Sequence, residues 1–105
     1  MKFTKRCRED RPERFQLFIR QLRADGAQVL EIKEFPTGTT SGRYEKHIVF
    51  DNATCAIANT ENKVITVKFL RPSNLYRYNF TEEFHADIYE KAYRNEAMGW
   101  NFFDK

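Results

Sequence analysis

Three consecutive segments between Tyr44 and Leu70 constrain the fold of this chain most strongly. Residues 44–50, 53–59 and 63–70 are rich in β-branched and aromatic side chains, and short polar breaks separate them. Such runs predict strands, and breaks as short as Asp51-Asn52 and Glu61-Asn62 predict hairpin turns with antiparallel pairing. We therefore expect a β-meander in the middle of the chain, against which any amphipathic helix must pack.

A further strand and two helices are predicted on either side of these segments. Residues 28–35 alternate between apolar and polar side chains and predict the first strand. Residues 11–25 predict an amphipathic helix that Gly26 ends, because apolar side chains recur there at helical spacing: Phe15, Phe18, Ile19 and Leu22. A second helix is expected to start at Thr81 and to end at Gly99, with an apolar face made by Phe84, Ile88 and Ala92.

Together these elements predict a single α+β domain over residues 1–105, in the order α-β-β-β-β-α. The expected sheet is a four-stranded antiparallel meander with both helices packed on one face, which leaves its other face open. Residues 1–9 are expected to be a basic lead-in that includes a short edge strand at 2–5. Residues 36–42 are expected to be a loop, and residues 100–105 an aromatic tail.

Several kinds of site are not expected. The chain has no CxxC, no HExxH and no other paired Cys/His spacing, so we expect no metal and no cofactor. No apolar run approaches the ~20 residues of a membrane span, and no apolar segment follows the basic start as it would in a secretory signal. Two cysteines, Cys7 and Cys55, make no disulfide framework. We expect a reduced, cytoplasmic protein.

The positive charge is concentrated in two segments. The net charge is only +3, but residues 1–25 carry eight Lys or Arg against four acids. Residues 63–80 carry four cations and no acid, whereas residues 81–105 carry three cations against six acids. This asymmetry points to the two basic segments as partner-binding regions.

Residues 68–80 interleave aromatic rings with cations, and this predicts nucleic-acid binding. Arg and Lys neutralise phosphate, and Tyr rings stack on exposed bases. The predicted binding residues are Lys68, Arg71, Tyr76, Arg77 and Tyr78, with Lys5, Arg6 and Arg8 from the lead-in. The alternative left open is a loop clamped to the core by its aromatic side chains, with its arginines in solvent.

Acid–base catalysis is the one enzymatic alternative. Glu45 and His47 leave the same face of a strand roughly 7 Å apart, and Arg43 is two residues earlier. Ribonucleases that use the 2′-hydroxyl of RNA need a general base, a general acid and cations, and Glu45, His47 and an Arg on an open sheet face fit these roles. In outline, a helix followed by a four-stranded antiparallel sheet also looks similar to small bacterial toxin ribonucleases of the barnase and RelE type, so the enzymatic alternative is a metal-independent endoribonuclease. The alternative is an exposed polar strand face.

A protein partner fits the same surfaces. Tyr and Arg are frequent at interfaces, and the strand at 28–35 can accept a partner or a second copy as an uncovered edge. The acidic helix near the C-terminus is either a phosphate mimic or a solvated face. Compact, aromatic-rich chains without catalytic motifs are typical of small phage-encoded regulators and inhibitors. We favour a non-enzymatic intracellular protein that binds nucleic acid or a nucleic-acid-handling protein, then the ribonuclease, then a structural homodimer.

Overall fold

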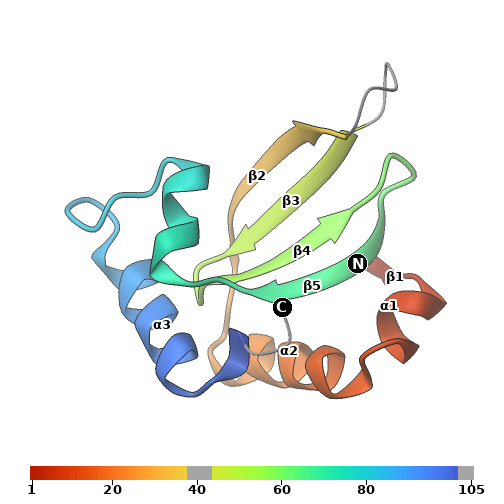
Figure 1. Cartoon of the computed structure of the whole chain (residues 1–105), viewed down its shortest axis with the longest axis horizontal. Coiled ribbons are helices and arrows are strands. Elements are labelled where there is room, and N and C mark those ends of the chain that lie inside the picture. Colours follow the sequence, from red (N-terminus) through yellow and green to blue (C-terminus); the bar gives the residue numbers. More distant parts are fainter. Residues whose placement is uncertain (38–43, 102–105) are drawn as a thin grey trace.

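The four strands between Val29 and Phe69 form the antiparallel meander that the sequence predicts, and Figure 1 shows it as the centre of the domain. The computed structural model describes residues 1–37 and 44–101. The strands are β1 (Lys2–Phe3), β2 (Val29–Pro36), β3 (Tyr44–Phe50), β4 (Thr54–Ala58) and β5 (Lys63–Phe69). The helices are α1 (Lys5–Glu9), α2 (Pro12–Ala24), the 3₁₀ helix η1 (Pro72–Tyr78) and α3 (Ala86–Ala97). The predicted α+β class is confirmed.

The prediction of a purely antiparallel four-stranded sheet is wrong in detail, because β1 joins it as a fifth strand. The order is β1-β5-β4-β3-β2, and β1 runs parallel to β5 with Lys2 opposite Lys63 and Phe3 opposite Val64. The lead-in then turns into α1, whose first turn is capped by Thr4: its Oγ1 accepts from the N–H of Cys7 at 3.1 Å. The lead-in is therefore part of the folded domain.

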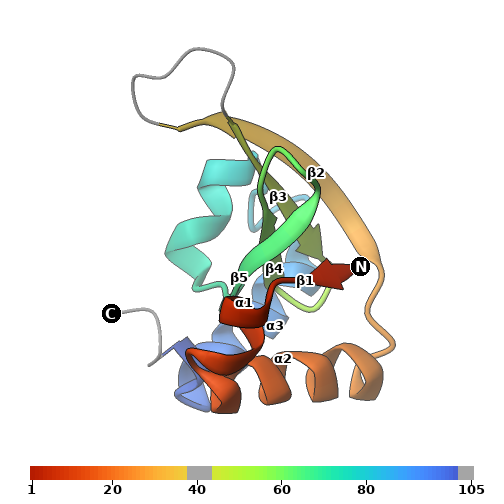
Figure 2. The same cartoon turned by 90° about the vertical axis from the view of Figure 1, so that its right-hand side faces the viewer.

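Helix α2 covers one face of the sheet (Figure 2). It occupies Pro12–Ala24, within one residue of the predicted 11–25. Phe18 is fully buried, and its ring meets the ring of Phe50 edge-on at 6.0 Å. On the sheet, the same cluster contains Ala56, Ala58 and Phe69 among its buried residues. The helical spacing seen in the sequence therefore marks a real core face.

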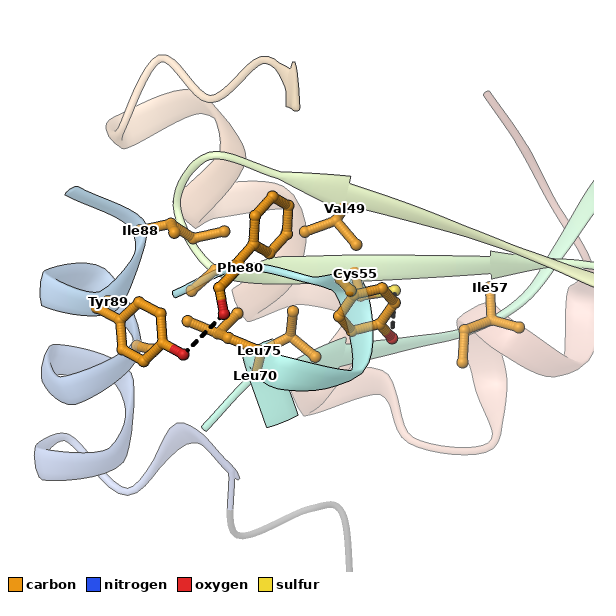
Figure 3. Packing of buried hydrophobic residues seen from close by; sticks show 11 residues of the cluster. Val49, Cys55, Ile57, Leu70, Leu75, Phe80, Ile88 and Tyr89 are labelled. Atoms are coloured by element: carbon orange, nitrogen blue, oxygen red, sulfur yellow. Dashed lines mark hydrogen bonds between the residues drawn. The ribbon is translucent and has the colours of Figure 1, made fainter. Parts of the chain in front are cut away.

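The prediction that both helices share one face is also wrong. Figure 3 shows residues of η1 and α3, including Leu75 and Tyr89, packed against the opposite side of the sheet around Val49 and Cys55. The reason lies in β4, in which all five residues are buried. Four consecutive residues of β4, from Cys55 to Ala58, are apolar, so their side chains need cover on both faces of the sheet. Neither face of this strand is open.

The second helix begins later than predicted. Thr81 closes a separate turn, because its carbonyl accepts from the N–H of His85 at 2.8 Å and its Oγ1 from the N–H of Phe84 at 3.4 Å. Helix α3 starts only at Ala86. Phe84, predicted on the apolar face, is 78% exposed. Of the predicted aromatic tail, Trp100 packs against Phe69 with ring centres 5.6 Å apart, and residues 102–105 lie outside the described part.

A polar cluster joins the end of α2 to α3 and to the turn between β3 and β4. Arg94 donates from Nη1 and Nη2 to the two carboxylate oxygens of Asp25, each at 2.9 Å. Asn52 donates to the same carboxylate at 3.1 Å, and Asn95 donates to the carbonyls of Asn52 and Ala53 at 3.2 and 3.1 Å. The hydrogen bond from Arg94 holds the pKa of Asp25 below its ordinary value, although burial opposes this shift.

We expect Asp25→Asn to lower the free energy of unfolding by roughly 2 kcal/mol at neutral pH, because Arg94 loses its charged acceptor. The folded pKa of Asp25 is depressed. The contribution of Asp25 to folding stability is therefore complete above its unfolded-state pKa of about 4. It is lost as the pH falls through the lower pKa of the folded state. Urea unfolding at neutral and acid pH measures both effects.

The matched control is Glu90→Gln, which neutralises an exposed acid on α3. The difference in the free energy of unfolding between wild type and Asp25→Asn should become smaller as the pH falls below about 4. A gap of constant size, or an equal loss in the control, would contradict the role assigned to this ion pair.

Candidate nucleic-acid-binding surface

The segment after β5 folds into η1 for local reasons. Pro72 occupies the first turn, where its missing N–H costs nothing, and Asn74 Oδ1 accepts from the backbone N–H of Arg71 at 3.0 Å. Asn79 ends the helix in the left-handed conformation, with φ 65°. Asn is one of the few residues that tolerate that conformation. No helix was predicted between the last strand and Thr81, so η1 is a new finding.

A 3₁₀ helix has three residues per turn, so side chains three apart lie in rows along it. Leu75 and Tyr78 form the row that faces the core, and they are 0% and 3% exposed. Asn74 and Arg77 form a second row, and both are exposed. Tyr76 belongs to the third row and is 60% exposed. The buried row anchors the helix and so directs the other two outward.

Three predicted cations meet around a pocket of about 220 Å³ between β5 and η1. The pocket is lined by Lys68, Leu70, Arg71, Ser73, Asn74, Arg77 and Tyr78. Of these, Lys68, Arg71 and Arg77 are basic, and no acidic side chain of the described residues lines the pocket. Ser73 and Asn74 add neutral polar groups. Such a site attracts an anion and offers it charged and neutral hydrogen-bond donors.

A fourth cation, Lys33 on β2, lies beside this pocket. Its Nζ donates to the carbonyl of Arg77 at 2.9 Å and is 5.3 Å from the centre of the Phe35 ring. The guanidinium of Arg77 lies over the same ring at 4.7 Å. The Phe35 ring therefore supports two cations, and both contacts favour a defined position for Arg77. Lys33 and Phe35 were not predicted as site residues, because only the pairing of β2 with β3 brings them close to η1.

His47 and Tyr78 lie beneath η1, on the core side of the pocket. His47 Nδ1 and the Tyr78 hydroxyl share a hydrogen bond of 2.7 Å, and His47 Nε2 is 3.5 Å from a carboxylate oxygen of Glu45. The imidazole is 2% exposed and packs against Phe35 with ring centres 4.4 Å apart. The Tyr78 hydroxyl is also 3.9 Å from the sulfur of Cys55.

Burial decides the protonation of this pair. It lowers the pKa of His47, an effect that Glu45 opposes and that Arg77 and Lys68 reinforce to a smaller extent. Burial likewise raises the pKa of the Tyr78 hydroxyl. Both groups are therefore neutral at pH 7. Together they form an uncharged contact that holds η1 on the sheet.

The residues of the enzymatic alternative do not form an accessible site. Glu45 and His47 do lie on one face of β3 as predicted, but that face is covered by η1, and the imidazole is buried. The third residue, Arg43, lies outside the described residues. A general acid or base must reach the proton that it transfers. In this position His47 contacts Tyr78 and Phe35 instead of solvent.

Among the predicted binding residues of η1, Tyr78 differs from expectation and Tyr76 does not. Tyr78 is 3% exposed, so its ring belongs to the core and is not available for stacking on a base. Tyr76 is exposed, and its ring meets Tyr89 edge-on at 5.8 Å. Of the two tyrosines of η1, Tyr76 is therefore the one whose ring is exposed enough to stack on a base.

The predicted cations of the lead-in form a separate basic region. Lys5 and Arg8 on α1 line an open depression of about 610 Å³ with Lys2 and Lys63. Arg6 instead pairs with Asp10 at 2.9 Å, and Lys5 is 3.9 Å from Glu9. Lys63 and Lys68 begin and nearly end β5, roughly 17 Å apart along the strand. In Figure 1, α1 and η1 accordingly lie at opposite ends of β5.

The described residues contain no group of three or more His, Cys, Asp or Glu arranged to hold a metal ion. Nor does any described helix combine the length and apolar character that crossing a membrane requires. Comparison with known protein families, with characterised proteins and with solved structures finds no match to this chain.

We expect Tyr78→Phe to lower the free energy of unfolding by about 1–2 kcal/mol, because it leaves the buried Nδ1 of His47 without its partner. The pKa of His47 is depressed, so its contribution to stability is complete above the unfolded value of about 6.5 and declines as pH falls from there to the folded pKa. Chemical denaturation of wild type across this range should show stability falling with pH. The control Tyr76→Phe, at an exposed position, should change stability by less than about 0.5 kcal/mol.

Proposed function

We propose that this chain is a non-enzymatic intracellular module that binds single-stranded nucleic acid through the basic surface formed by β5 and η1. The observation that carries the proposal is the convergence of Lys68, Arg71 and Arg77 on one pocket without an acidic lining residue. Phosphate contacts supply most of the affinity of such modules. Exposed Tyr76 on the neighbouring row of η1 adds a ring on which an unpaired base can stack.

The buried position of His47 favours binding over the ribonuclease alternative. Strand cleavage that uses the 2′-hydroxyl needs a base and an acid in contact with the nucleotide. Here the imidazole contacts Tyr78, and its carboxylate neighbour Glu45 is only 35% exposed. Arg71 and Arg77 of the pocket are exposed, whereas the imidazole of His47 is 2% exposed.

The first experiment is to incubate the protein with fluorescently labelled single- and double-stranded RNA and DNA in the presence of a chelator. Binding is followed by anisotropy and cleavage on a denaturing gel. We expect salt-sensitive binding of single strands without cleavage. Cleavage that His47→Ala abolishes would establish the ribonuclease instead. Absence of both signals would overturn the proposal and indicate a protein partner.

We expect the double variant Arg71→Ala/Arg77→Ala to bind single strands at least tenfold more weakly at moderate salt. Two lost phosphate contacts should also reduce the slope of log K against log salt by about 1.4. The matched control is Arg20→Ala/Arg23→Ala, which removes the same charge from exposed positions of α2. Equal losses of affinity in the two double variants would show that binding depends on net charge alone and would contradict a defined binding site.

Tyr76→Ala tests the contribution of stacking. We expect it to weaken single-strand binding by about tenfold, because base–aromatic stacking contributes about 1–3 kcal/mol per base. The salt slope should not change, since no phosphate contact is lost. Tyr76→Phe keeps the ring and should retain nearly all of the affinity. A loss in Tyr76→Phe as large as that in Tyr76→Ala would exclude stacking as the role of this residue.

A further inference from the structure

Strand β2 is the last strand of the sheet, and its outer side is an edge. The sheet order ends at β2, which pairs with β3 alone among the described strands. It contains eight residues, Val29–Pro36. An edge strand presents a row of backbone N–H and C=O groups that another strand can pair with. Natural proteins usually keep such edges short or cover them, so a strand of this length calls for an explanation.

The side chains of this edge are unusually apolar for a solvated strand. Val29, Leu30 and Ile32 are 53%, 44% and 55% exposed. Leu30 also lines an open depression of about 450 Å³ that it shares with Phe84. Aliphatic side chains this exposed lower the free energy when a partner covers them. Charged residues lie between and after them, at Glu31, Lys33 and Glu34. The order of these charges indicates which partner fits the edge.

We propose that β2 pairs antiparallel with β2 of a second copy of this chain, about a two-fold axis that passes between the two Ile32 residues. In this register Ile32 faces Ile32 of the other copy, and Glu31 of each copy faces Lys33 of the other. Residues that face each other across antiparallel strands lie about 5 Å apart on the same side of the sheet, so Glu31 of one copy is within reach of Lys33 of the other. The Lys33 ammonium has three N–H groups, of which one donates to the carbonyl of Arg77 in its own chain. The register places two apolar side chains on the axis and an unlike charge pair on either side of it.

Among the symmetric registers of β2, only the one centred on Ile32 places unlike charges opposite each other, and those centred on its charged residues are unfavourable. In a two-fold antiparallel pair of this kind, one residue lies opposite itself. An axis at Glu31, Lys33 or Glu34 would place like charges directly opposite each other, which destabilises the pair. Ile32 is the one residue between Glu31 and Glu34 that avoids this. The charge pattern of β2 is therefore complementary to itself in a single register, as an interface between identical copies requires.

The ends of β2 are consistent with this pairing. Pro36 has no N–H to donate. It lies at the end of β2, outside the segment that would pair with the second copy. The register with β3 shifts between Val29 and Glu31, and from Glu31 to Pro36 it is regular. The centre of the proposed interface thus falls in the regular part of the strand. Pairing would join two five-stranded sheets into one continuous sheet of ten strands.

The test is the molecular mass of the free protein by sedimentation equilibrium from micromolar to millimolar concentration, without nucleic acid. We expect a monomer–dimer equilibrium. Ile32→Lys places two like charges on the axis and should raise the dimer dissociation constant at least about tenfold. The control Met98→Lys adds the same charge at another exposed apolar position, which is 59% exposed, and should leave the equilibrium unchanged. Thermal unfolding followed by circular dichroism verifies that both variants fold.

A charge swap identifies the register. Glu31→Lys alone should weaken the dimer, and the double variant Glu31→Lys/Lys33→Glu should restore it, because each lysine again faces a glutamate. A monomer at every concentration would overturn the proposal. So would a dimer that Ile32→Lys leaves intact, or a double variant no stronger than the single one. Because no nucleic acid is present, these outcomes are independent of the fate of the proposed binding function.

Discussion

The burial of β4 on both of its faces is the constraint on which the rest of the structure depends. Cys55 and Ile57 face η1 and α3, whereas the small residues Ala56 and Ala58 face the large ring of Phe18 on α2. A central strand of this kind requires an apolar layer on each side. The helices are therefore distributed over both faces, and the position of every functional side chain follows from which layer its element belongs to.

The basic surface is a consequence of what lies underneath it. Leu75 and Tyr78 turn inward, and the Tyr78 hydroxyl meets His47 in an environment from which water is excluded. A buried neutral imidazole is a good hydrogen-bonding partner but a poor proton carrier. The histidine that resembled a catalytic residue in the sequence is buried in contact with Tyr78 and Phe35, whereas Arg71 and Arg77 above it are exposed. Phe35 connects the buried layer to the basic surface, because its ring contacts the buried His47 and also lies under the guanidinium of Arg77.

Local patterns predicted the parts of this molecule that local physics determines. The apolar spacing from Phe15 to Leu22 and the alternation along β3 depend on near neighbours, and both α2 and the meander were predicted correctly. Strand β1 was only suggested and its parallel pairing was not foreseen, because two residues carry no periodic signal and depend on β5 for their pairing. Lys68, Arg71 and Arg77 were predicted as binding residues and do share a pocket. The fold of η1 back over the sheet determines that Tyr78 and His47 are buried and that Lys33 lies beside the pocket. These contacts join segments far apart in the sequence, so local patterns cannot predict them.

The two edges of the sheet differ, and this difference determines how large an assembly can become. At the β5 edge, the chain's own first residues occupy the start of the strand, and Arg14 Nη2 donates to Thr66 Oγ1 at 2.9 Å further along. At the other edge, β2 is long and uncovered among the described strands. A sheet that can extend at one edge only stops growing after a single addition, whereas a sheet open at both edges polymerises into a fibre. The two residues of β1 leave a further strand little backbone to pair with, so the association that we propose through β2 should stop at two copies. A truncation that removes β1 should expose the start of β5 as a second edge.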